Sequence, residues 1–159
     1  MKKVLYIFGS ILLMGTLGFA YYAISPLFIN IKVDEALPST ETVKTQGKQT
    51  QEVPQSAAKA EVVGTTGHPA SGTARVVETE GKTYIRYEDF KTINGPDIYV
   101  YLAKDLDAKE FVDLGRVRAT EGNINYEVPP GVDASDYRYV LTWCKQFGVL
   151  FNYADLGIL

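Results

Sequence analysis

The sequence predicts an all-β domain, a β-sandwich or a small barrel-like fold, behind an N-terminal transmembrane helix and a flexible linker. Three observations lead to this prediction. Residues 4–31 carry no charged side chain, and residues 38–60 are polar and low in complexity. Beyond Gly64 the apolar residues fall in short runs separated by turn residues. Short strands with regular turns are typical of sandwiches and barrels.

Residues 1–37 are interpreted as a signal-anchor, or transmembrane, segment. A membrane-spanning helix needs about 20 apolar residues, whereas a cleaved signal peptide has an apolar region of about 7–15. Residues 4–23 meet the longer requirement, and Pro26 is where we expect the helix to end. Two lysines precede the span and two acidic residues follow it. The positive-inside rule then places the N-terminus in the cytoplasm and the rest of this single-pass protein outside the cell membrane.

The alternative is a secreted protein, released by cleavage near Ala20. Gly18-Phe19-Ala20 has the small-x-small pattern that signal peptidases accept. Against cleavage, apolar residues continue beyond this point through Leu27, Phe28 and Ile31, which favours a retained anchor. Both alternatives place the domain outside the cytoplasm.

The remaining residues divide into a linker and one foldable unit. Residues 38–60 contain no aromatic, Ile or Leu residue, so we expect a disordered linker that cannot offset its ordering entropy by burial. Residues 61–159 are long enough for one small domain and too short for a two-domain enzyme. This domain carries ten Lys or Arg against fifteen Asp or Glu, which argues against nucleic-acid binding.

Within the domain we expect six strands. They are, in chain order, residues 83–87, 97–102, 114–119, 123–128, 137–144 and 149–151. Residues 97–102 are apolar on both faces, as in a central strand. Alternation along 137–144 predicts one face with Tyr137, Tyr139, Leu141 and Trp143, and another with Val140, Thr142 and Cys144. Residues 108–113 and 154–156 are the candidates for short helical turns.

The chain contains one cysteine, Cys144, and one histidine, His68. A single cysteine cannot form an intrachain disulfide, and two potential ligands are too few for a structural zinc site. A blue-copper site lacks its second histidine. The methionines, Met1 and Met14, lie outside the domain, which excludes His/Met haem ligation within it. No metal site or cofactor is therefore predicted, and haem or another electron carrier would reach the chain only through a partner.

Three residues are candidates for a functional site. A reactive Cys144 would need a nearby cation and an accessible sulfur, but on a strand the adjacent Lys145 points to the opposite face. By residue type alone a free cysteine is more often a buried core residue. His68, in Gly67-His68-Pro69, is a candidate ligand or proton donor, or an ordinary loop residue. Asp97 follows Asn94-Gly95-Pro96 and either belongs to a site or caps a turn.

Several short motifs occur together in one order along the domain. They are His68-x-x-Ser71-Gly72, Asp89-Phe90, Asn94-Gly95-Pro96-Asp97 with Tyr101-Leu102, Gly115, Gly122, and Trp143-Cys144-x-x-Phe147-x-x-x-Phe151-x-x-Ala154-x-Leu156. In this combination residues 62–157 resemble the electron-transfer DM-thirteen domain family, the module that accompanies DOMON domains in Skeletor-like proteins. The membrane exit, Ser25-Pro26-Leu27-Phe28 and Glu35-Ala36-Leu37-Pro38, resembles that of anchored prokaryotic members.

The resemblance implies an all-β, extracytoplasmic domain with electron transfer or another redox reaction through the cysteine that Cys144 matches. Since this chain has no companion DOMON domain, its electron partner would be another protein or a diffusible cofactor. In this hypothesis Cys144 cycles between the thiol and a sulfenic acid or mixed disulfide. The alternative is a non-catalytic cell-surface binding or assembly module with a buried structural cysteine. An exported hydrolase or metalloenzyme is disfavoured by the ligand inventory, and the sequence predicts no oligomeric state.

Overall fold

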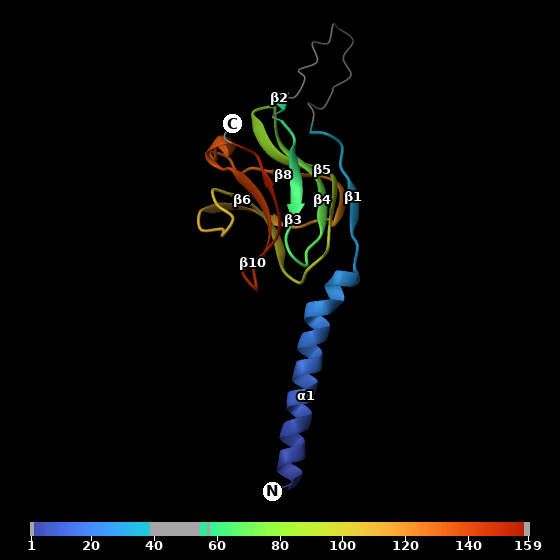
Figure 1. The fold of residues 1–159 in the computed structure, drawn as a ribbon. Helices are drawn as coiled ribbons and strands as arrows, with labels where there is room; N and C mark the ends of the chain where they lie inside the picture. Colours follow the sequence, from blue (N-terminus) through green and yellow to red (C-terminus); the bar gives the residue numbers. More distant parts are fainter. Residues whose placement is uncertain (1, 39–54, 57, 158–159) are drawn as a thin grey trace.

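A computed structural model describes residues 2–38, 55–56 and 58–157 of the chain (Figure 1). The predicted linker residues 39–54 and 57 lie outside the described residues. The elements are α1 (Lys2–Ile24), η1 (Ser25–Phe28), β1 (Lys32–Asp34), β2 (Gln55–Ser56), β3 (Ala60–Gly64), β4 (Ala70–Thr79), β5 (Lys82–Thr92), β6 (Ile98–Ala103), β7 (Phe111–Arg116), β8 (Glu121–Glu127), η2 (Ala134–Asp136), β9 (Tyr139–Cys144) and β10 (Val149–Asp155). The predicted all-β class of the domain is confirmed.

The helix α1 projects away from the β domain, as Figure 1 shows. It ends at Ile24, and the 3₁₀ turn η1 with Pro26 near its start follows directly. Its apolar part, Tyr6–Ile24, is 19 residues long and is not buried against the domain. Among the described residues this is the one helix long and apolar enough to cross a membrane, and its length and position also suit a signal sequence.

The strands form one curled sheet, a half-barrel with the order β1-β8-β5-β4-β3-β10-β9-β6-β7, and β2 pairs with β4. The pairing of β1 with β8 is parallel, and the other pairings are antiparallel. The curl brings the inner faces of β4, β5 and β8 toward those of β6 and β9. One large apolar core fills the interior, with Ile85, Tyr87, Leu102, Ile124 and Val140 among its buried members.

The two predicted faces are confirmed from Tyr139 to Cys144. The predicted strand 137–144 begins two residues too early, and Tyr137, which precedes β9, packs against the large core and not with the outer face. Val140 belongs to the large core and Cys144 to a small second cluster at one end of the sheet. On the outer face, Leu141 lies in a third cluster, against which Tyr139 and Trp143 pack. Alternation along a strand therefore identified which side chains share a face, because successive side chains point to opposite sides of a sheet.

The segment after the helix joins the sheet. Residues 32–34, which the sequence assigned to the exit of the N-terminal segment, pair with β8. The guanidinium of Arg86 donates from Nη1 to the carbonyl oxygens of Glu35 and Ala36, at 3.3 and 3.2 Å. Gly122 makes the pairing possible, because a Cβ atom there would overlap with the carbonyl oxygen of Val33. The exit is therefore held against the domain over several residues.

Three further local predictions were wrong. Residues 111–113 are not a helical turn but the start of β7, so the predicted strand 114–119 begins three residues too late and ends at Arg116. Residues 154–155 continue β10 instead of forming a helical turn. In both places hydrogen-bonded pairing with a neighbouring strand, β6 for β7 and β9 for β10, overrides weak local preference.

Two of the motifs in the sequence form a single structural feature, a pair of facing irregularities in β4 and β5. The register shifts between Ser71 and Thr73 in β4, opposite residues 88–91 of β5. Gly72 has φ +111° and Asp89 has φ +49°. A Cβ atom on Gly72 would lie 2.7 Å from the oxygen of Asp89 and 2.7 Å from the Cα atom of Phe90. Ser71-Gly72 and Asp89-Phe90 are therefore two halves of one close backbone contact.

Next to this contact, Glu88 lies between three cations. Its carboxylate is within 2.6 Å of Lys59 Nζ, 2.6 Å of Arg75 Nη2 and 2.9 Å of Arg86 Nε. The side chains of Glu88 and Arg86 are only 13% and 8% exposed. Burial by itself raises the pKa of Glu88, but the hydrogen bonds from Lys59, Arg75 and Arg86 outweigh it and lower the pKa to about 2.

Candidate functional site

Cys144 is the last residue of β9, where it pairs with Ile98 of β6 and Val149 of β10. Its side chain is 1% exposed and lies in the second apolar cluster with Ile98 and Phe151. The partly buried residues Ile93, Val117 and Val149 pack against this cluster. The thiol is therefore covered by apolar side chains in this conformation.

His68 contacts the same phenylalanine. Its ring stacks on that of Phe151, with centroids 4.0 Å apart and an angle of 28° between the planes. His68 Nδ1 is 3.2 Å from Thr65 Oγ1, and that hydroxyl is 2.7 Å from the carbonyl oxygen of Leu150. The Thr65 hydroxyl thus links the His68 ring to the main chain of β10.

The side chain of Asp97 points to the opposite face of the sheet. Its carboxylate pairs with the guanidinium of Arg116, which lies over the ring of Tyr99 at 5.5 Å. Only the main chain of Asp97 is next to the cysteine, since its carbonyl oxygen accepts a hydrogen bond of 2.9 Å from the amide of Lys145. The structure therefore brings His68 and Cys144 to one phenylalanine and separates the Asp97 carboxylate from both.

Lys145 does not face the thiol. Its ammonium group lies 4.7 Å from the centre of the Tyr99 ring and 3.4 Å from Asp113 Oδ2, on the outer face of the sheet. The prediction that a residue following Cys144 on the strand points away is thus confirmed. Lys145 is therefore not placed to stabilise a thiolate at Cys144 in the way that neighbouring cations do in many enzymes.

The Asn94-Gly95-Pro96 loop closes the cluster from the end of the sheet. Gly95 lies so close that an added Cβ atom would be 2.9 Å from Ile98 Cγ2 and 3.0 Å from Phe151 Cζ. Asn94 donates from Nδ2 to the carbonyl oxygen of Ile29 at 3.1 Å. This loop therefore connects the phenylalanine beside Cys144 with the segment that leaves the helix. Sequence reasoning identified the loop but not Phe151 as the residue that unites it with His68 and Cys144.

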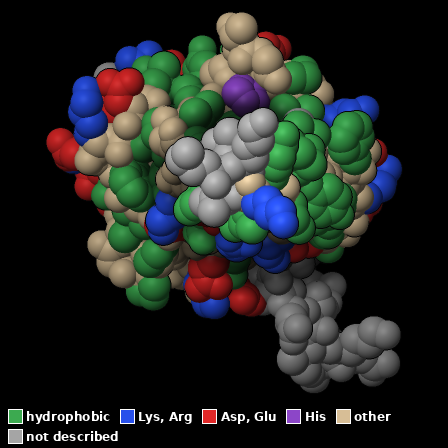
Figure 2. Space-filling model, turned by 90° about the horizontal axis from the view of Figure 1, so that it is seen from below, with side chains coloured by type: hydrophobic (Ala, Val, Ile, Leu, Met, Phe, Trp, Pro, Cys, Tyr) green, Lys and Arg blue, Asp and Glu red, His purple; other side chains and the backbone are tan. Residues whose placement is uncertain are grey.

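The same end of the domain contacts α1. The hydroxyl of Tyr22 donates to Gln146 Oε1 at 3.0 Å, and the rings of Phe19 and Phe147 meet edge to face with centroids 6.4 Å apart. Gln146 and Phe147 belong to the turn between β9 and β10, directly after Cys144. Seen from the side of α1, the single histidine is visible on this face of the domain (Figure 2).

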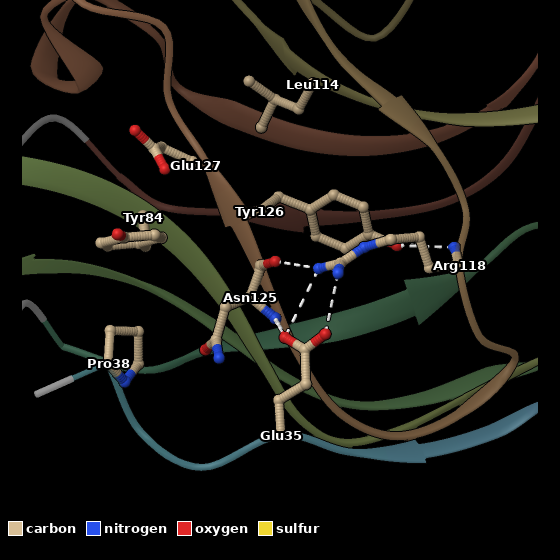
Figure 3. Close-up of a pocket in the computed structure, with 8 residues that line it drawn as sticks. All are labelled: Glu35, Pro38, Tyr84, Leu114, Arg118, Asn125, Tyr126 and Glu127. Carbon is tan, nitrogen blue, oxygen red and sulfur yellow. Dashed lines mark hydrogen bonds and ion pairs between the residues drawn. The ribbon is translucent and has the colours of Figure 1, made fainter.

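A concave region lies along β8. It has a volume of about 540 Å³ and is lined by Glu35, Pro38, Tyr84, Leu114, Arg118, Asn125, Tyr126 and Glu127. Figure 3 shows the guanidinium of Arg118 directed at Glu35, with Arg118 Nη1 2.8 Å from Glu35 Oε1. The guanidinium also lies over the ring of Tyr126 at 5.0 Å. The Glu35 carboxylate is paired with Arg118 and accepts a hydrogen bond from the amide of Asn125. The polar groups of this groove therefore bind the segment that follows the helix.

The described residues contain no group of three or more His, Cys, Asp or Glu side chains able to hold a metal ion. Fold and site together define a small half-barrel domain with a lone, covered thiol at the end that contacts an apolar helix. The model of the family described as Electron transfer DM13 matches residues 62–156, and the chain belongs to this family. No curated protein and no solved structure matches the chain.

Proposed function

We propose that the chain is a membrane-tethered, extracytoplasmic electron-transfer domain whose working end is the one that carries Cys144. The observation that carries this proposal is the convergence of the family's motif residues on Phe151. Cys144 and Gly95 pack against this ring, and His68 stacks on it. The motifs that contain His68, Gly95 and Cys144 are far apart in the sequence. Their meeting at one ring favours a shared function over a cysteine that only fills the core.

The chemistry assigned to Cys144 follows from its being the single cysteine. As a thiolate it attacks one sulfur of a partner's disulfide, a mixed disulfide forms, and the partner's other sulfur leaves as a thiolate. A second thiol from a reductant then attacks the mixed disulfide and releases Cys144. Because the sulfur is 1% exposed, this exchange requires the end of the β9–β10 hairpin to open.

Burial also favours a second candidate function, a cell-surface binding or assembly module in which Cys144 only fills the core. Its support is the apolar surroundings of the sulfur and the position of Lys145 on the opposite face. The two functions differ in one measurable property, the opening that exposes the thiol. Redox chemistry needs local opening, whereas a structural cysteine is exposed only when the whole domain unfolds.

The test is the rate at which a thiol reagent labels the folded, full-length chain near neutral pH. We expect Cys144 to react at least about tenfold faster than global unfolding allows, and denaturant at low concentration to change this rate little. Labelling that follows global unfolding, together with unchanged function in Cys144→Ser, would contradict the redox role and favour the binding module.

Thr142 offers a matched control position. It lies two residues before Cys144, on the same face of β9, and is completely buried. In a Cys144→Ala background, the substitution Thr142→Cys places the thiol deeper in the same strand. Local opening of the hairpin end predicts that this thiol reacts more slowly than Cys144. Equal rates would mean that both positions are exposed by the same global event.

The tether has its own test, the N-terminal mass of the protein purified from membranes. A retained anchor predicts a chain that begins at or next to Met1 and stays with the membrane in alkaline carbonate. The physical reason is that Tyr6–Ile24, at about 1.5 Å per residue, matches the thickness of a bilayer core. A soluble protein that begins after Ala20 would establish cleavage and secretion instead.

A further inference from the structure

We propose that the turn between β9 and β10, residues 145–148, docks on the bilayer beside α1, with Phe147 inserted at the boundary between headgroups and acyl chains. The inference rests on the proposed tether and adds to it a second membrane contact, made by the β domain itself. Its partner is the lipid surface.

The turn lies beside the last part of α1. Phe147 meets the ring of Phe19, which lies five residues before the end of α1 at Ile24. At about 1.5 Å per residue, Phe19 is about 7 Å inside the end of the apolar span. A side chain in contact with Phe19 is therefore at the depth that interfacial apolar groups reach, about 5–10 Å.

The tip of the turn is an exposed apolar side chain. Phe147 is 46% exposed although it is one of the largest apolar side chains of the domain. Phe28 and Ile29, which follow the helix, are 81% and 53% exposed. These side chains extend the apolar surface of α1 outward at the end nearest the domain. Water is an unfavourable environment for such a surface, and a bilayer covers it.

The turn also carries polar side chains beside its apolar tip. Gln146 Oε1 accepts a hydrogen bond of 3.0 Å from the hydroxyl of Tyr22. Tyrosines near the end of a spanning helix typically lie at the level of the headgroups. The neighbouring Lys145 directs its ammonium group toward Tyr99 and Asp113. A turn with an apolar tip and a charged flank suits a headgroup boundary.

The surroundings of α1 favour lipid, and not a second copy of the chain, as the partner of the turn. Phe147 touches α1 itself, so whatever surrounds the helix at Phe19 also surrounds the turn. The helix is apolar along Tyr6–Ile24 and unburied, and such a helix is covered by acyl chains on all sides when it spans a membrane. The turn therefore shares the environment of the helix.

The test uses tryptophan fluorescence of the full-length chain in phosphatidylcholine vesicles with brominated acyl chains, which quench at short range. The sequence has a single tryptophan, Trp143, so Trp143→Phe gives a background without signal. Into this background we place Phe147→Trp, Phe19→Trp or Phe111→Trp. Phe111 is the matched control, because its side chain is 43% exposed, nearly as much as that of Phe147. It begins β7, whereas the last residue of that strand, Arg116, pairs with Asp97, whose carbonyl oxygen binds the amide of Lys145 in the turn.

We expect brominated lipid to lower the emission of Phe147→Trp about twofold, close to the effect on Phe19→Trp, and to leave Phe111→Trp unchanged. Quenching of Phe19→Trp without quenching of Phe147→Trp would overturn the docking and leave the tether intact. Absence of quenching at all three positions would overturn the tether and, with it, the docking. Equal quenching of Phe147→Trp and Phe111→Trp would also overturn the docking, because lipid would then contact the domain without regard to the turn.

Discussion

Replacing Gly72 by alanine is expected to lower the free energy of unfolding by about 3 kcal/mol, measured by urea denaturation. The added Cβ atom would lie 2.7–2.8 Å from three main-chain atoms of Glu88, Asp89 and Phe90. Main-chain atoms inside a paired sheet cannot move aside as the end of a side chain does. The backbone at Gly72, with φ +111°, is in addition strained for any residue with a Cβ atom.

Gly115→Ala separates the two causes of this loss. Gly115 has φ +104°, close to that of Gly72, but nothing within 4 Å of an added Cβ atom. This control should show only the backbone penalty, about 1 kcal/mol. If both variants lose the same stability, the close contact between β4 and β5 contributes nothing and the explanation of the two motifs is wrong.

The second large effect is expected for Glu88→Gln, which should lower the free energy of unfolding at pH 7 by about 3 kcal/mol. The carboxylate has a pKa of about 2 in the folded domain, against 4.5 for an unperturbed group. A lowered pKa means that the stabilisation is complete above pH 4.5 and disappears as the pH falls toward 2. In the variant, Arg75 and Arg86 each lose their ion pair with the Glu88 carboxylate.

The measurement is the unfolding free energy of both proteins between pH 7 and pH 2. The difference between them should be largest at neutral pH and should close near pH 2, where Glu88 becomes protonated. Glu127→Gln is the matched control, because Glu127 pairs with Lys82 at a surface where both side chains are about half exposed. That variant should lose much less. A difference for Glu88→Gln that does not depend on pH would contradict an electrostatic origin.

The strands that the sequence identified either alternate without interruption or, like residues 97–102, are apolar throughout. In 123–128 and 137–144 each apolar residue that pointed inward in the pattern also points inward in the structure, for example Ile124 and Val140. β4 went unnoticed because Gly72 interrupts its alternation and two adjacent valines, Val76 and Val77, are both buried. The start of β7 was misread because pairing with β6 decides it, and pairing is not written in any local pattern.

The candidate site was predicted in its parts and not in its arrangement. Cys144 and His68 stood out because the chain has one of each. Their common neighbour, Phe151, is one of seven phenylalanines, and although it belongs to the motif that begins at Trp143, no local pattern places it beside His68. The separation of the Asp97 carboxylate from the thiol was equally hidden, because it depends on the register of β6 against β9. A shift of one residue in that register would reverse the faces.

The sequence by itself determined the class of the domain, the apolar helix before it and the inventory of reactive groups. These properties depend on composition and on short-range periodicity, which any stretch of chain carries within itself. Only the tertiary structure decided that residues 32–34 belong to the sheet, that Gly72 and Asp89 meet, and that Cys144 is covered by Phe151 at the end that contacts the helix. The reason is physical: these contacts join residues far apart in the chain, and the curl of the sheet sets their positions.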